Sequence, residues 1–166
     1  MTKLVLKGVA VLLILTVGAI LFVYLNRSDP LGRVPGKRLL GEEVAGPIAD
    51  WSFTEVARVV ILEVRPSAPY SVIVSCLNHD GTYYGLATSI QNRWVQYLIE
   101  DPNIRFKVED AVYPARADMV EDPRLISDLF DALAQKYRGG RDWTPEQRAP
   151  IDLFELTPAE FKPSSS

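Results

Sequence analysis

The stretch "TSIQNRWVQYLIEDPNIRFKV", residues 88–108, combines three signals without an intervening spacer. A polar cluster with one arginine leads into a short amphipathic segment, which predicts a helix over residues 91–99. The Asp-Pro pair that follows ends this helix, because proline disfavours helical backbone in the residue before it. The remainder alternates apolar and basic side chains, which predicts a half-buried strand over residues 104–108 with Arg105 and Lys107 on its polar face.

Three strand-like segments precede that stretch. Residues 57–65, "ARVVILEVR", are almost wholly apolar, which is typical of a strand covered on both faces. A second strand is predicted over residues 70–77. The sequence "NHDG" after it indicates a tight hairpin, because Asp-Gly tolerates positive φ angles. The chain then returns as a third strand over residues 82–88.

The segments after it complete the pattern. Residues 111–120 predict a strand with an edge or bulge at Pro114, and "IDLFEL", residues 151–156, predicts the last strand. Between them lies the clearest helix, which Asp122 can cap and Gly139 can end. Hairpins dominate and no repeated strand–helix–strand unit occurs. We therefore expect a mainly β (α+β) domain, a small antiparallel barrel flanked by helices.

The N-terminal segment is of a different kind, because no charged side chain occurs from Gly8 to Leu25. At ~1.5 Å per helical residue, this run is roughly as long as the ~30 Å hydrocarbon core of a bilayer. A cleaved signal peptide would share the basic start and the apolar run, but no small-x-small cleavage site follows here. We therefore expect residues 1–25 to be an uncleaved single-pass membrane anchor, with residues 8–25 in contact with lipid.

The orientation of this anchor rests on opposing cues, because basic residues flank it on both sides. Lys3, Lys7 and the amino terminus precede it, and four basic residues follow it: Arg27, Arg33, Lys37 and Arg38. Translocation of this short basic segment across the membrane is unfavourable. This favours an N-terminus on the inner side of the membrane, which we expect to be a bacterial inner membrane. The side on which the soluble domain lies stays open.

Composition divides the rest of the chain. Residues 26–49 contain three prolines and four glycines and are expected to be a linker, residues 50–160 form the barrel domain, and residues 161–166 are expected to be a disordered tail. From residue 50 to the end there are 12 basic and 18 acidic side chains, a net charge of −6. A nucleic-acid-binding domain would normally present a basic face, so we expect no nucleic-acid partner.

The chain has one cysteine, Cys76, and one histidine, His79. They cannot form a multi-cysteine or paired-histidine metal site within one chain, so no metal site is expected. No nucleophile–base–orienter set can be assembled either. If chemistry occurs, a cofactor must carry it.

The order of elements resembles the FMN-binding split β-barrel group over about residues 50–160. The segments that carry this resemblance are "HDGTYYGLATS", "NRWVQYLIEDPNIRFKVEDAVYPARADMVEDP" and "LFELTP". The group includes pyridoxamine 5'-phosphate oxidase-like proteins and deazaflavin-dependent nitroreductases. The resemblance implies a homodimer that holds FMN or a deazaflavin in the groove between its subunits and acts on a small molecule.

In this group, hydroxyls and a basic residue near the start of the short helix hold the cofactor phosphate. The matching positions are Thr88, Ser89, Asn92 and Arg93. A helix N-terminus suits a phosphate because it offers unpaired N–H groups and a partial positive charge, and arginine adds charge-assisted donors. The start of the second strand often contacts the flavin ring, which implicates Tyr70 and Ser71, although these residues can also simply pack.

Other roles are open for several of these positions. Ser89 can be an ordinary helix cap, and Arg93 can lie beside Trp94 or pair with Asp101. Trp94 can stack on a flavin or be a core residue of the amphipathic helix. Arg65, in "RPSAPYS", can supply a second positive charge if its side chain faces the groove.

Two functions follow as alternatives. The first is a membrane-anchored flavoprotein that accepts hydride and passes electrons to a small acceptor such as a quinone or nitro compound. The second is a non-catalytic split-barrel binding module or an accessory subunit of a membrane complex. Arg65 or Arg116 converging on Arg93 would favour the first function. Arg93 alone, or acids facing the groove, would favour the second.

Overall fold

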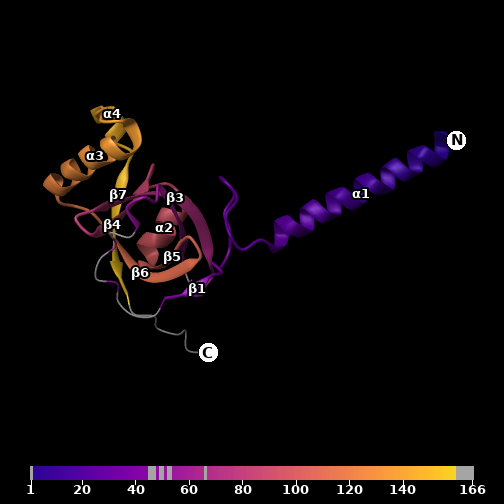
Figure 1. The fold of residues 1–166 in the computed structure, drawn as a ribbon, viewed down its shortest axis with the longest axis horizontal. Helices are drawn as coiled ribbons and strands as arrows, with labels where there is room; N and C mark the ends of the chain where they lie inside the picture. Colours follow the sequence, from indigo (N-terminus) through magenta and orange to yellow (C-terminus); the bar gives the residue numbers. More distant parts are fainter. Residues whose placement is uncertain (1, 45–47, 49–50, 52–53, 66, 160–166) are drawn as a thin grey trace.

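Two parts of the molecule are separated in space (Figure 1). The computed structural model describes residues 2–44, 48, 51, 54–65 and 67–159. Helix α1 (Thr2–Asn26) extends away from a body of strands and shorter helices. The expected tail, residues 161–166, lies outside the described residues, as does Asp50 at the expected start of the barrel.

Six of the described strands close into an antiparallel barrel in the order β5-β2-β3-β4-β7-β6, and pairing of β6 with β5 completes the ring. Their bounds are β2 (Val59–Val64), β3 (Tyr70–His79), β4 (Thr82–Ala87), β5 (Asn103–Val108), β6 (Ala111–Met119) and β7 (Asp152–Pro158). The expected fold, a small antiparallel barrel flanked by helices and preceded by one long apolar helix, is confirmed.

Local backbone chemistry explains two features of these strands. The β3–β4 hairpin turns at Asp80 and Gly81, whose φ angles are 51° and 78°, as the Asp-Gly signal predicted. Pro114 lies in β6 between the residues that pair with the short strand β1 (Glu42–Glu43) and those that pair with β7. It pairs with Arg105 of β5, but its carbonyl oxygen faces the other side of β6, where it accepts a hydrogen bond from the Ala159 N–H. Its missing N–H faces that same side, in the gap between the β1 and β7 pairings, as expected for a proline at an edge.

In the described part of the chain, three shorter helices accompany the barrel: α2 (Arg93–Glu100), α3 (Pro123–Arg138) and α4 (Pro145–Arg148). Asp122 caps α3 by accepting a hydrogen bond from the Arg124 N–H at 2.9 Å, and Gly139 ends it with φ 61°, both as predicted. The buried face of α3 forms a second hydrophobic cluster on the outside of the barrel with residues of β3, β4 and β7. This cluster contains Leu77, Tyr84, Leu129, Phe130, Leu133 and Leu153.

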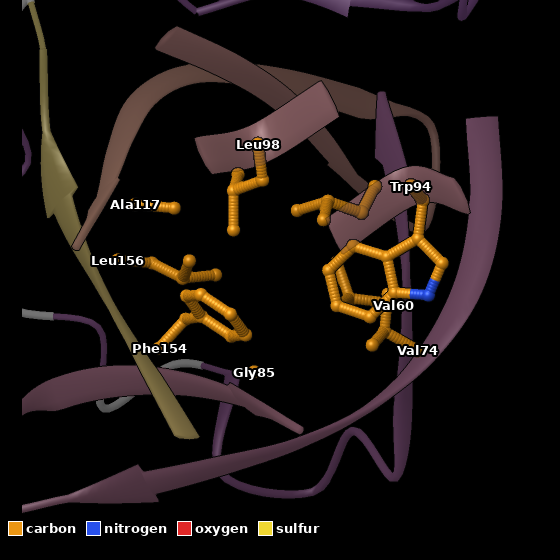
Figure 2. Close-up of a pocket in the computed structure, with 9 residues that line it drawn as sticks. Val60, Val74, Gly85, Trp94, Leu98, Ala117, Phe154 and Leu156 are labelled. Atoms are coloured by element: carbon orange, nitrogen blue, oxygen red, sulfur yellow. The ribbon is translucent and has the colours of Figure 1, made fainter. Parts of the chain in front are cut away.

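The interior of the barrel is filled by side chains. Trp51 is 2% exposed and lies 5.0 Å from Phe106 and 5.4 Å from Tyr113 between ring centroids. Leu98 of α2 points into the barrel toward β4 and β7 (Figure 2). A cavity beside Gly85 has a volume of about 10 Å³, which is room for no more than a water molecule. A cofactor-sized ligand must therefore bind on the outer surface.

Residues 27–44, here called the strap, lie within the expected linker but pack against the barrel. Gly36 exchanges backbone hydrogen bonds with Ser71 of β3, and Leu39 is 1% exposed. A Cβ on Gly36 would overlap the Ser28 carbonyl oxygen and the Ser71 hydroxyl, so only glycine fits there. This part of the predicted linker is a layer of the barrel surface and not a free spacer.

The strap also buries a charged network that the alternating pattern of β5 did not reveal. Arg105 was predicted on the polar face of a half-buried strand, yet it is 6% exposed, and Glu63 opposite it on β2 is 0% exposed. One guanidinium nitrogen of Arg105 donates to both Glu63 carboxylate oxygens, at 3.1 and 2.9 Å, and the other donates to Glu43 at 2.7 Å. The Leu39 N–H donates to Glu63 at 2.6 Å, so the ion pair holds the strap directly.

Candidate functional site

The outer face of β3 is covered at both ends and open in the middle. Ser71 lies under the strap and Leu77 lies under α3, whereas Ile73 is 42% exposed and Ser75 is exposed. At ~3.3 Å per residue, the two covered positions are roughly 20 Å apart. Between them lies a groove with a volume of about 320 Å³, at the lower end of the ~300–1,000 Å³ range of small-molecule sites.

Three regions of the chain line this groove, and most of its wall is apolar. Its floor is the outer face of β3 and β4, one end is the start of α2, and the opposite wall comes from the last turn of α3 and the chain after it. The lining residues are Ile73, Val74, Ser75, Leu86, Thr88, Asn92, Trp94, Tyr137, Trp143 and Ile151. None of these carries a charge. The groove thus has aromatic walls and hydroxyl and amide groups toward one end.

The polar end of the groove is the N-terminus of α2. Asn92 is the N-cap residue and its side chain makes no capping hydrogen bond. The backbone N–H groups of Arg93 and Trp94 have no hydrogen-bond partner among the described residues. Unpaired N–H groups at a helix start, together with the partial positive charge of the helix dipole, favour an anionic group there.

Ser89 does not cap α2. Its hydroxyl accepts a hydrogen bond from the Gln91 N–H at 3.1 Å, and its carbonyl oxygen accepts one from the Asn92 N–H at 3.1 Å. Ser89 therefore shapes the turn that leads into the helix. This turn leaves the Thr88 hydroxyl exposed on the groove wall, within 3.5 Å of the Asn92 amide nitrogen.

Arg93 and Arg65 meet over one aromatic ring beside the groove. Their guanidinium carbons lie 5.9 and 4.2 Å from the centroid of the Tyr97 ring, and the Tyr70 ring meets the same ring edge-on at 5.5 Å. Neither arginine forms an ion pair with any residue in the described part of the chain. Arg116 does not join them, because it pairs with Asp118 at 2.8 Å.

The structure therefore divides the eight predicted site residues into four groups. Thr88, Asn92 and Trp94 line the groove. Arg65, Arg93 and Tyr70 gather around Tyr97 next to it, and Ser89 shapes the connecting turn. Ser71 is fully buried beneath the strap, where its hydroxyl has no hydrogen-bond partner, so it could contact a ligand only if the strap moved. Their ligand-binding roles stay predictions.

The Trp94 side chain contacts both the interior of the barrel and the outer groove. Its ring lies 5.9 Å from the Phe154 ring and also borders the small internal cavity, where Figure 2 shows it beside Val60 and Val74. The same side chain also lines the outer groove. Core packing therefore fixes the ring whose other edge is available to a ligand, and the two proposed roles of Trp94 are compatible.

Sequence reasoning missed the wall formed by Tyr137, Trp143 and Ile151. The Tyr137 hydroxyl accepts a hydrogen bond from the Cys76 N–H at 3.1 Å and lies within hydrogen-bonding distance of the Cys76 and Arg58 carbonyl oxygens. These contacts fix its ring at the groove, and burial raises the pKa of the Tyr137 phenol to about 12. Tyr137 lies on the apolar stripe that the sequence predicts for this helix. The signal for Trp143 is its position in the polar stretch after the glycine pair that ends α3, where a large aromatic side chain needs a surface to cover.

No protein-family model and no curated protein matches the sequence. Solved structures do match. A proposed pyridoxamine 5'-phosphate oxidase from Listeria innocua is 15% identical, with a TM-score of 0.51 over 69% of this chain and 94% of that chain. A conserved hypothetical protein from Mycobacterium tuberculosis is 16% identical, with a TM-score of 0.54 over 72% and 86% of the two chains.

A third match is a proposed 5-nitroimidazole antibiotic resistance protein from Bacteroides thetaiotaomicron, which is 12% identical. Its TM-score is 0.53, over 69% of this chain and 83% of that chain. At these identities the likeness is one of fold. The barrel of this chain has the fold of the pyridoxamine 5'-phosphate oxidase-like, FMN-binding split-barrel proteins.

Proposed function

We propose that this protein is a membrane-anchored oxidoreductase-like protein that binds FMN or a deazaflavin in the outer groove. The observation that supports this proposal is the groove itself. Its aromatic and apolar walls lie next to a helix N-terminus with two unpaired N–H groups. A flavin-type cofactor combines a flat aromatic ring system with a phosphate, so its two ends match the two ends of the groove.

The residues fit such a group as follows. The Arg93 and Trp94 N–H groups and the Thr88 hydroxyl would bind the phosphate, and the Trp94 and Trp143 rings would flank the flat ring system. The guanidinium groups of Arg93 and Arg65 near Tyr97 form no ion pair within the described residues and would make the potential at this end more positive, although they do not line the groove. The bound group would supply the hydride chemistry, and the protein would orient it and exclude water.

The apolar strand face beside the groove supports a homodimer. Val59 on β2 and Ile73 on β3 are 53% and 42% exposed and lie on the outer face that neither the strap nor α3 covers. A second copy packed on this face would bury both side chains and close the groove from the outside. The groove of one chain would then be half of the complete ligand site.

Helix α1 supports the anchor. The span Lys7–Asn26 has a mean hydropathy of 2.7 and is not buried against the rest of the described chain. An anchor that holds the barrel close to the bilayer suits a small acceptor dissolved in or near the membrane, such as a quinone or a nitro compound. Reporter fusions at the C-terminus would establish on which side of the membrane the barrel lies.

One observation favours the alternative, a non-catalytic binding module or an accessory subunit. No charged side chain lines the groove, so a dianionic phosphate would depend on backbone N–H groups and on arginines at its margin. Such a groove also suits a neutral aromatic ligand. The two functions differ in a simple observable, because a bound flavin absorbs visible light and most other ligands do not.

The test is to purify the full chain in detergent and record its visible spectrum before and after incubation with FMN or a deazaflavin. We expect a flavin-type spectrum that stays with the protein through gel filtration. Asn92→Leu, at the polar end of the groove, should reduce retention at least tenfold. Ile99→Ala, at a 54% exposed position on α2 outside the groove lining, should not. A protein that stays colourless after both incubations would refute the proposal.

A further inference from the structure

We propose that the hairpin Ser28–Lys37 and the adjacent Arg38 form a contact surface for anionic lipid headgroups. This inference rests on the proposed membrane anchor. It concerns the layer of the molecule that lies between helix α1 and the barrel. The partner is the surface of the bilayer that α1 enters. The contact would fix the orientation and height of the barrel relative to that surface.

The end of α1 ties this hairpin to the plane where the helix would leave the bilayer. Lys37 donates to the Leu25 carbonyl oxygen at 2.7 Å, and Arg27 donates to the Tyr24 carbonyl oxygen at 2.6 Å. These bonds satisfy carbonyl groups that a helix end leaves unpaired. The Arg27 guanidinium also lies 3.9 Å from the centroid of the Tyr24 ring, a pairing suited to the headgroup level, where tyrosine and arginine are enriched.

Both ends of the hairpin therefore lie at the end of the helix, and its tip is within reach of the headgroups. The Lys37 N–H donates to the Ser28 carbonyl oxygen at 2.6 Å, and Leu31 and Val34 exchange hydrogen bonds at 3.0 and 2.9 Å. Gly32, with φ 56°, makes the turn. From Ser28 to this turn the chain spans roughly 13 Å at ~3.3 Å per residue. The headgroup layer is about 5–8 Å thick on each side of a bilayer.

The exposed side chains of the hairpin match such a surface. Leu31 is 67% exposed next to the turn, and Arg33 in the turn is exposed and has no ion pair among the described residues. Arg38 approaches Glu43 only to 3.8 Å. The one acid inside the hairpin, Asp29, is bound to Lys107 of the barrel at 3.1 Å. An apolar tip flanked by exposed basic side chains is the arrangement that binds anionic interfaces, at about 1 kcal/mol per basic residue.

The barrel itself would be repelled by the same surface, because residues 50–166 carry a net charge of −6. The hairpin is therefore the attractive face of an otherwise acidic body. Asp29 fastens it to β5, and Gly36 fastens it to β3 at Ser71, two residues before Ile73 in the groove. Binding of lipid by the hairpin would thus hold the groove at a fixed height above the bilayer.

The test uses the full chain reconstituted into vesicles, with an environment-sensitive fluorophore on Leu31→Cys. The native Cys76 is 0% exposed and should not react. The control position is Val56→Cys, 90% exposed on the barrel. One set of vesicles contains phosphatidylcholine alone, and the other also contains phosphatidylglycerol. Flotation of the vesicles reports insertion of α1 separately, so failure of the anchor and failure of the hairpin contact are distinguishable.

We expect the label at position 31 to shift to shorter emission wavelength and to be quenched by a lipid-attached quencher only in the anionic vesicles. The label at position 56 should do neither. A free energy of 1 kcal/mol is about a fivefold change in an equilibrium constant. Removing both charges with Arg33→Gln and Arg38→Gln should therefore lower the ratio of hairpin in contact with lipid to hairpin in water about 25-fold. Inserted protein that shows the same emission at position 31 in both lipids, or no effect of the double variant, would overturn the inference.

Discussion

Replacing Glu63 by glutamine tests whether the buried ion pair holds the strap on the barrel. The carboxylate is 0% exposed and accepts two hydrogen bonds from Arg105 and one from the Leu39 N–H. Removing one partner of a buried pair costs about 3–5 kcal/mol, because the other charge stays buried without full compensation. Arg105 keeps its bond to Glu43 at 2.7 Å, so we expect a loss near the lower limit, about 3 kcal/mol.

The assay is equilibrium urea unfolding of the full chain in detergent, followed by tryptophan fluorescence, to which the buried Trp51 contributes. A loss of about 3 kcal/mol is a large part of the 5–15 kcal/mol that stabilises an ordinary domain. A double variant with leucine at positions 63 and 105 should lose at least about 2 kcal/mol less than the sum of the two single leucine variants. The reasoning is refuted if Glu63→Gln costs less than about 1 kcal/mol, or if the two leucine replacements are additive.

Three further perturbations follow from the structure. Gly85→Ala should raise the free energy of unfolding by about 0.4–1 kcal/mol in the same urea assay. The new Cβ would meet open space beside the internal cavity, and the unfolded chain would lose conformational freedom. A destabilised variant would contradict this. Gly36→Ala should detach the strap, because its Cβ would overlap the Ser71 hydroxyl, and trypsin should then cleave at Lys37 faster than in the parent; equal cleavage rates would show that the strap adapts. Burial raises the pKa of Tyr137 from its ordinary value near 10 to about 12. The stability that its protonated form contributes is complete below pH 10 and is lost as the pH rises to 12. Tyrosinate absorbance and loss of circular dichroism should therefore rise together between pH 10 and 12. Ionisation of all tyrosines near pH 10 without unfolding would contradict this expectation.

Much of the barrel could be predicted from local patterns because its strands carry their own signals. The Asp-Gly hairpin, the β-branched runs and the capped helix α3 are each encoded by residues near one another in the chain. The strap could not be predicted in this way. Its proline- and glycine-rich sequence has no periodicity. The atoms that a Cβ would meet at Gly36 and Gly41 include those of Ser71 and Asp110, which lie far away in the sequence. The burial of Arg105 follows from the same long-range contact.

Some residues of the candidate site could be predicted from local sequence, and others are brought to it only by long-range contacts. Thr88, Asn92 and Trp94 surround a helix start that the sequence identifies directly, and all three line the groove. Tyr137 in the last turn of α3 and Trp143 beyond the helix complete its wall, and no local pattern connects them to β3. The convergence of Arg65 and Arg93 on Tyr97 likewise depends on how the loop after β2 folds back onto α2. Each helix or strand is encoded by residues close together in the sequence, whereas the site forms only when the barrel closes and brings distant segments together.

The most direct test of the central claim is a titration of FMN and of a deazaflavin against the full chain, read by quenching of cofactor fluorescence. Ser75→Trp places a large side chain in the groove from an exposed strand position, and Met119→Trp makes the same change at a 41% exposed position outside it. We predict saturable binding of at least one cofactor, weakened at least tenfold by Ser75→Trp and unchanged by Met119→Trp. Equal affinity in all three proteins would locate the cofactor elsewhere, and no binding to the parent would contradict the account.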